Sequence, residues 1–137
     1  MNALLKDGAT DDQTSRLADT ELHPAWKPDE PERILVCKNC QHLVTTTQER
    51  IEVRGDHEHT FFNPHGILFH LGCFHRAPGC ITDGALSLEF TWFAGYAWLL
   101  ASCMQCHQHL GWWFMNREKD TFFALILSRL QERPSQL

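Results

Sequence analysis

The segments Cys37-Lys38-Asn39-Cys40 and Cys103-Met104-Gln105-Cys106 decide the fold, because each places two thiols in one Cys-x-x-Cys turn. Two such turns supply four thiolates, which complete the tetrahedral shell of a structural zinc ion. Most of the apolar sequence lies between the two segments. The spacing therefore predicts a Zn2+ ion that joins distant parts of one domain. Its ligands would be Cys37, Cys40, Cys103 and Cys106.

Two other interpretations of these cysteines are open at this point. The thiols could be unligated or disulfide-bonded, and His107 completes the Cys-x-x-Cys-His motif of c-type haem attachment. Haem attachment requires export, but residues 1–20 are acidic and contain no apolar signal segment. A haem would also leave Cys37 and Cys40 without a role. Zinc uses all four thiols, and two matched Cys-x-x-Cys segments seldom occur without a metal.

Length and composition indicate one small domain. The chain has 137 residues, of which 43% are hydrophobic and 11% aromatic, enough for a modest core that a bound metal would reinforce. The formal net charge is −5 and Lys and Arg do not cluster, which argues against a nucleic acid polymer as partner. No segment has the length and apolarity of a membrane helix, and no signal peptide is recognised. We expect a cytoplasmic protein without a membrane partner.

The pattern along the chain predicts three regions and an all-β domain. Residues 1–32 are polar and acidic and are expected to form a flexible N-terminal tail, 33–133 form the domain, and 134–137 form a short C-terminal tail. Short apolar runs between turn residues predict antiparallel sheets. The runs are 34–36, 42–44, 59–62, 67–71, 86–92, 98–103 and 110–115.

Two of these predictions rest on periodicity alone. Residues 86–92 alternate apolar and polar side chains, which makes this the clearest strand in the sequence. Near the C-terminus, the spacing of Phe122, Phe123, Ile126 and Leu130 predicts a short helix, with a final strand as the alternative.

Four of the five tryptophans fall within residues 92–113. Strand parity lets Trp92, Trp98 and Trp112 converge from neighbouring strands, with Phe114 on the same face of its strand as Trp112. Three indoles around a gap would form an aromatic box. The plainer interpretation is an aromatic core, and the pattern alone favours it.

Longer segments around these tryptophans resemble a known family. The phrases are Glu89-Phe90-Thr91-Trp92-Phe93-Ala94-Gly95-Tyr96-Ala97-Trp98 and His109-Leu110-Gly111-Trp112-Trp113-Phe114, on either side of the second Cys-x-x-Cys segment. Together with residues 55–59 and 62–66 they resemble the cereblon-type thalidomide-binding (CULT) domain, including its single-domain bacterial homologues. The resemblance covers about residues 34–130. It implies a zinc-stapled β-tent of two antiparallel sheets, with a pocket of Trp92, Trp98 and Trp112 closed by Phe114.

Pockets of this family bind cyclic imides of the glutarimide and thalidomide type, and in bacterial members uracil- or uridine-like rings. The resemblance therefore implies such a small-molecule ligand, or a protein terminus that carries a cyclic imide. It implies that Asn63 borders the ligand, that Tyr96 supports the box and that Glu89 lies near the rim. Backbone groups near Phe90 and Trp92 would pair with the imide edge. Animal members have a histidine in place of Phe90, which puts the preference of the rim in question.

Two other functions are compatible with parts of the sequence. Methionine sulfoxide reductases of the B type share the β-tent and the zinc motifs, but they need a nucleophilic cysteine on a late strand, and none follows Cys106. An activated thiol at Cys73 or Cys80 is the remaining enzyme alternative. An aromatic box could instead read methylated ammonium groups, with Glu89 as the nearby carboxylate. The sequence favours a protein that binds without catalysing.

Overall fold

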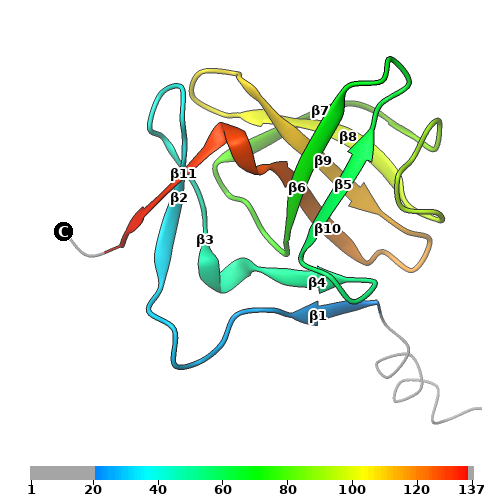
Figure 1. Cartoon of the computed structure of the whole chain (residues 1–137). Helices are drawn as coiled ribbons and strands as arrows, with labels where there is room; N and C mark the ends of the chain where they lie inside the picture. Colours follow the sequence, from blue (N-terminus) through cyan, green and yellow to red (C-terminus); the bar gives the residue numbers. More distant parts are fainter. Residues whose placement is uncertain (1–20, 136–137) are drawn as a thin grey trace, which may run out of the picture.

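The computed structural model describes residues 21–135, and all regular elements in this range are strands or short 3-10 turns (Figure 1). This range contains no α-helix, and so no helix that could span a bilayer. The strands are β1 (Leu22–Pro24), β2 (Arg33–Cys37), β3 (Leu43–Thr46), β4 (Ile51–Val53), β5 (Glu58–Phe62), β6 (Leu68–Phe74), β7 (Cys80–Ser87), β8 (Ala97–Cys103), β9 (His109–Met115), β10 (Thr121–Ile126) and β11 (Leu130–Pro134). The 3-10 turns are η1 (Thr47–Glu49) and η2 (Leu127–Arg129).

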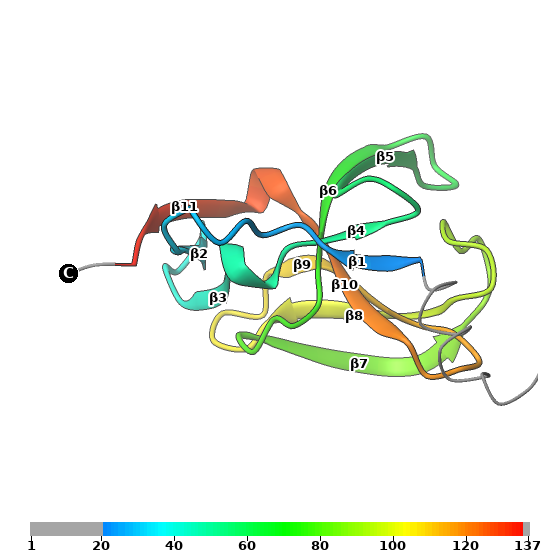
Figure 2. The ribbon, with the colours of Figure 1, turned by 90° about the horizontal axis from the view of Figure 1, so that it is seen from below.

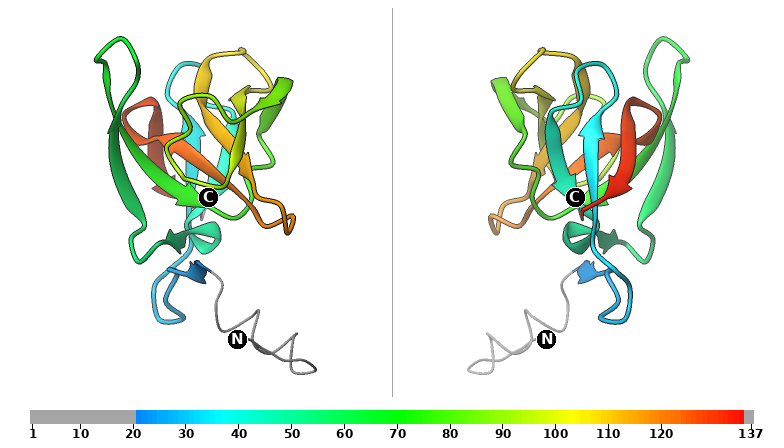
Figure 3. Two further views of the ribbon diagram at one scale, coloured as in Figure 1. Left: turned by 90° about the vertical axis from the view of Figure 1, so that its right-hand side faces the viewer. Right: turned by 90° about the vertical axis from the view of Figure 1, so that its left-hand side faces the viewer.

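The strands form two main antiparallel sheets and one small one. The large sheet has six strands in the order β5-β6-β10-β9-β8-β7, and the second has three in the order β11-β2-β3. Figure 2 shows the three-stranded sheet beside one end of the large sheet. The large sheet is curved, so that the β5–β6 hairpin and the β7–β8 pair stand on opposite sides of the view in Figure 3. The predicted all-β class with antiparallel sheets is confirmed.

The third sheet pairs β1 with β4, with Leu22 opposite Val53 and Pro24 opposite Ile51. Residues 22–24 of the predicted N-terminal tail are therefore part of the folded domain. Residues 1–20 of the predicted N-terminal tail lie outside the described residues, as do residues 136–137 of the predicted C-terminal tail.

The predicted C-terminal helix is wrong. The segment instead forms β10, which lies between β6 and β9 in the large sheet, followed by η2 and β11. Phe122, Ala124, Leu125 and Ile126 are all buried, because a central strand is covered on both faces. A strand buried on both faces carries a nearly continuous apolar run, whose spacing also satisfies a helical period.

The predicted strand at 86–92 is also wrong in its second half, because β7 ends at Ser87 and a loop follows. Leu86, Leu88 and Phe90 are 44%, 64% and 71% exposed, so their alternation marks no buried face. Phe90 has a φ of 56°, in the left-handed region, which ends an extended strand. Trp92 therefore lies in a loop, which we define as residues 88–96 and call the pocket loop.

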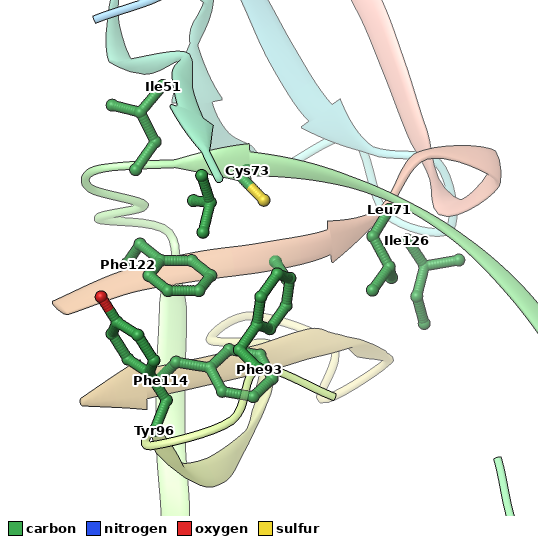
Figure 4. Close-up of a cluster of buried hydrophobic side chains, with 10 residues drawn as sticks. Ile51, Leu71, Cys73, Phe93, Tyr96, Phe114, Phe122 and Ile126 are labelled. Carbon is green, nitrogen blue, oxygen red and sulfur yellow. The ribbon is translucent and has the colours of Figure 1, made fainter. Parts of the chain in front are cut away.

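The core consists of two clusters. Figure 4 shows the first, in which Phe93 and Tyr96 of the pocket loop pack with Phe114 and Phe122 of the sheet. The Phe114 and Phe122 rings stack with centroids 5.2 Å apart, and Phe93 meets both edge-on. The second cluster lies around the cysteines and includes Leu35, Val44, Phe74 and Leu110. The first cluster supports the aromatic residues of the cavity, and the second supports the cysteine cluster.

Candidate functional site: a four-cysteine cluster and an aromatic cavity

The four cysteines of the Cys-x-x-Cys segments meet at one point. Their Sγ atoms all lie within 4.8 Å of one another, with Cys37 3.7 Å from Cys106 and Cys40 3.6 Å from Cys103. A disulfide would need about 2.05 Å. A tetrahedron of four sulfurs, each about 2.3 Å from a zinc ion, has edges of about 3.8 Å. The donor set and its spacing therefore fit a tetrahedral metal site.

The two segments have the same construction. In each, the residue after the second cysteine donates its N–H to the carbonyl of the first: Gln41 to Cys37 at 2.7 Å and His107 to Cys103 at 2.8 Å. Gln41 and His107 have φ values of 68° and 66°, so both turns close through the left-handed region. One turn joins β2 to β3 and the other joins β8 to β9. A metal at this point would therefore tie the three-stranded sheet to the six-stranded sheet.

The environment of the thiols is uneven. Burial raises the pKa of the Cys37 thiol to about 12, although the N–H groups of Cys40 and Asn39 hydrogen-bond to its sulfur. The pKa of the Cys106 thiol is lowered to about 6, chiefly by a hydrogen bond from the Asn39 side chain. A buried thiolate such as that of Cys37 needs a compensating positive charge, which a divalent cation would supply.

An aromatic cavity of about 240 Å³ opens at the other end of the large sheet's β8–β9 pair. Trp98 comes from β8, and Trp112 and Phe114 come from β9. The pocket loop supplies Phe90 and Trp92, and the turn between β5 and β6 supplies Asn63 and Pro64. None of these side chains carries a charge. The cavity is therefore a neutral, mainly aromatic space built from four elements: β8, β9, the pocket loop and the β5–β6 turn.

The indoles are held at defined angles. Trp92 and Trp112 meet edge to face, with ring centroids 4.7 Å apart and an interplanar angle of 75°. Trp92 Nε1 donates to the Phe62 carbonyl at 3.0 Å, and Trp98 Nε1 donates to the Glu89 carbonyl at 2.9 Å. Because these two indole N–H groups are already bonded to backbone, Trp92 and Trp98 offer a ligand mainly their ring faces.

Behind the cavity lie aromatic supports that the sequence analysis did not assign. Phe61 stacks on Trp92, with centroids 5.2 Å apart and planes within 6°. Phe69 and His109 meet Trp112 edge-on, at 5.2 Å and 4.7 Å. Phe61 and Phe69 are opposite each other in the β5–β6 pairing. The period of two in the runs 59–62 and 67–71 places Phe61 and Phe69 on one face of the hairpin. That periodicity is the sequence feature from which their supporting role could have been predicted.

The other predicted site residues take different positions. Asn63 lines the cavity, and its Oδ1 accepts the N–H groups of His65 and Ile67, both at 2.9 Å. The side chains of Glu89 and Tyr96 are not part of the lining. Glu89 acts through its carbonyl, which holds Trp98.

Tyr96 lies beneath the cavity, only 2% exposed, and packs edge-on against Phe122. The Asn116 side chain hydrogen-bonds to its hydroxyl, and burial raises the pKa of that hydroxyl. The structure therefore brings Asn63, Phe90, Trp92, Trp98, Trp112 and Phe114 together, with Glu89 and Tyr96 supporting them from outside the lining.

No protein-family model matches the chain. Over 106 residues it is 35% identical to the protein cereblon of Gallus gallus, a match that covers 72% of this chain and 24% of that protein. It is 34% identical over 106 residues to cereblon of Xenopus tropicalis, with the same coverage of both chains. It is 34% identical over 103 residues to cereblon of Danio rerio, covering 70% of this chain and 24% of that protein.

An all-β fold of antiparallel sheets, a four-cysteine cluster and an aromatic cavity define a CULT-like domain. The chain belongs to the cereblon family through this domain, with homology over about 70% of its length. It spans about a quarter of the length of the curated relatives it matches.

Proposed function

We propose that the aromatic cavity binds a small planar ring with an imide edge, of the glutarimide or uracil and uridine type. The observation that carries this proposal is the placement of three indoles around one uncharged cavity. At about 240 Å³ the cavity is smaller than sites for drug-sized ligands, which start at roughly 300 Å³. A single small ring suits this volume, and any substituent on it would project past the exposed Phe90.

An imide edge presents a carbonyl, an N–H and a second carbonyl in a row. The cavity walls offer hydrogen-bond partners for these three groups. Indole faces would enclose the ring, while backbone groups near Phe90 and Trp92 pair with the edge. The Asn63 amide nitrogen makes no hydrogen bond to the described residues and is a donor for a ligand carbonyl. A ring N–H left unpaired in this site would cost about 1–3 kcal/mol.

We further propose that the four-cysteine cluster holds one structural Zn2+. Four thiolates leave no open position for a substrate, so the ion would act as a cross-link rather than as a catalyst. Cys37 and Cys103 are completely buried, which shields the site from water. The metal would stabilise the relative placement of the two main sheets and add to the free energy of folding.

A thiol enzyme is the less favoured function. Burial raises the pKa values of both Cys73 and Cys80 to about 12, whereas a nucleophilic thiol needs a lowered pKa. The two thiols also belong to different core clusters, which does not suit a nucleophile and its resolving partner. The homology to cereblon likewise favours a binding domain.

A reader of methylated ammonium groups is less favoured as well. Cation recognition by an aromatic cage gains from a nearby carboxylate, but none lines the cavity. The exposed Glu89 contributes only its carbonyl to the structure of the box. A neutral ring matches the electrostatics of the lining better than a cation does.

Titration with a panel of ligands, followed by tryptophan fluorescence and calorimetry, tests the proposal. The panel is glutarimide, uridine, a peptide that ends in a cyclic imide, and trimethyl-lysine. We expect the imide-bearing ligands to bind with about micromolar affinity, since small rings have few atoms. Binding of trimethyl-lysine alone would contradict the imide proposal. In a separate activity assay, turnover of methionine-R-sulfoxide would contradict a role limited to binding.

A further inference from the structure

Arg54, in the turn between β4 and β5, fastens the pocket loop to the N-terminal part of the described chain. Its Nη2 atom donates to the Ala94 carbonyl at 2.6 Å. Its Nε atom donates to the Glu21 carboxylate, and its backbone N–H donates to the Glu21 carbonyl at 3.1 Å. One side chain thus bonds simultaneously to the residue before β1 and to the loop that carries Trp92.

The same guanidinium lies over the aromatic residues that anchor the loop. Its Cζ atom is 5.9 Å from the ring centroids of both Phe93 and Tyr96, within the range of cation–π contacts. Phe93 and Tyr96 are 1% and 2% exposed, so the partly exposed Arg54 guanidinium lies against two fully packed rings. Arg54 and Gly55 have φ values of 55° and 91°, as expected for the central residues of the two-residue turn between Val53 and Asp56.

The pocket loop needs external support because it has no strand neighbour of its own. Inside the loop, Thr91 Oγ1 donates to the Tyr96 carbonyl at 2.7 Å, and the Tyr96 N–H donates to the Phe93 carbonyl at 2.9 Å. Side chains of three elements outside or next to the loop also contribute: Trp92 donates to the Phe62 carbonyl on the β5–β6 hairpin, Trp98 of β8 donates to the Glu89 carbonyl, and Arg54 donates to the Ala94 carbonyl. Loss of the Arg54 bond would leave the Ala94 side of the loop without a side-chain anchor.

We propose that Arg54 is a positioning residue for the aromatic cavity, and that Glu21 orients it, so that the segment leading into β1 forms part of the binding apparatus. This inference rests on the proposed ring-binding function and adds how its site is kept in shape. The mechanism is preorganisation: a loop already fixed in the bound conformation loses less entropy when a ligand enters. Arginine suits this role because its rigid fork bonds Glu21 and Ala94 at once, which a lysine ammonium does not reproduce.

The chain contains a matched control in the pair Arg33–Glu132. There too an arginine Nε bonds a carboxylate, and the side chains are 39% and 39% exposed, compared with 36% and 39% for Arg54 and Glu21. Arg33 lies on β2 of the three-stranded sheet. Its backbone N–H bonds Thr47 and its side chain bonds Glu132, which also pairs with Arg50, and neither partner belongs to the pocket loop. The variants R54Q and R33Q therefore remove similar ion pairs, of which only one bears on the cavity.

Two readouts decide the inference. In the ligand-free protein, we expect R54Q to speed amide exchange over residues 91–96 by about tenfold and to increase quenching of tryptophan fluorescence by acrylamide. With uridine or glutarimide, we expect R54Q to weaken binding by about tenfold, E21Q to weaken it less, and R54K to fail to restore it. R33Q should leave loop exchange and affinity as in the wild type.

The outcomes separate this inference from the proposed function. Unchanged exchange of residues 91–96 in R54Q would overturn it, whichever ligands bind. Equal effects of R54Q and R33Q on affinity would also overturn it, because they would indicate general destabilisation. If the wild type binds no ring, the proposed function fails, while the exchange measurement still judges the role of Arg54. If the E21Q/R54Q double variant binds the ring as well as R54Q alone, Glu21 acts on the cavity through Arg54.

Discussion

Trp98 of β8 lies directly opposite Phe114 of β9, and both side chains line the aromatic cavity. The neighbouring pair, Leu99 of β8 and Trp113 of β9, lies on the other face of the sheet. Trp113 is also opposite Phe123 of β10. Two adjacent tryptophans, Trp112 and Trp113, therefore face opposite sides of the same sheet. This arrangement allows binding and folding to be tested separately within one strand.

Replacing Trp98 by alanine should abolish ring binding, because it removes one of the three indoles and opens the cavity to water. The side chain is only half-buried, so we expect the zinc content to stay unchanged and the melting temperature to fall modestly. Calorimetry with uridine and metal analysis of the same preparation check both points. Trp113→Ala is the control: it should cost stability and spare binding. A larger loss of affinity in the Trp113 variant would show that the cavity is not the binding site.

Replacing Cys40 by serine should release the metal and unfold the domain broadly, since the two Cys-x-x-Cys turns join the two main sheets. We expect one equivalent of zinc in the wild type and little in the variant, measured by atomic absorption, with loss of the near-ultraviolet circular dichroism signal. Cys73→Ala removes another completely buried thiol, which belongs to the other core cluster and is not among the four clustered cysteines. That variant should keep its zinc; if both variants keep it, the four-cysteine site is wrong.

How far the sequence predicts this structure depends on how local each feature is. The cysteine spacing identifies the cluster because each Cys-x-x-Cys turn is a local motif whose backbone sets both thiols. Trp98 and Trp112 are predictable from strand parity within β8 and β9. Trp92 is different, because the strand predicted to contain it ends at Ser87. Its ring is held instead by a hydrogen bond to the carbonyl of Phe62, which is distant in the sequence.

Other features depend on contacts that no local pattern encodes. The run from Phe122 to Ile126 has a spacing that fits a helix, but its burial on both faces is decided by β6 and β9, its neighbours in the sheet. The bond from Arg54 to Ala94 joins residues 40 positions apart. An exposed arginine in a polar turn carries no mark of such a partner in the sequence.

Gly79 gives a prediction about the contact between the two main sheets. A Cβ atom at this position would lie 2.0 Å from the Leu43 carbonyl oxygen and 2.6 Å from Val44 Cα, so both backbones would have to move. We expect Gly79→Ala to lower the melting temperature strongly, since a clash with backbone cannot be relieved by a change of rotamer.

Gly84 provides the comparison for Gly79. A Cβ there would have nothing within 4 Å, and only its φ of 96° opposes a side chain. Gly84→Ala should therefore cost about 1–2 kcal/mol from backbone strain alone. Thermal denaturation of both variants by circular dichroism measures the difference, and equal melting temperatures would show that the Gly79 contact with β3 is loose.

The ring N–H gives the sharpest prediction about the ligand. N-methylglutarimide has the shape of glutarimide plus one methyl group, but it cannot donate from the ring nitrogen. If backbone groups near Phe90 and Trp92 pair with the imide edge, the acceptor that faced the N–H loses its partner, at a cost of about 1–3 kcal/mol. We therefore expect N-methylation to weaken binding at least about tenfold, which corresponds to roughly 1.4 kcal/mol. Calorimetric titration of both compounds against the wild type measures the difference in affinity. The same titration against Phe90→Ala tests whether the added methyl group meets the rim sterically. Equal affinity of the two imides would mean that the indole faces alone hold the ring and that the imide edge is not read.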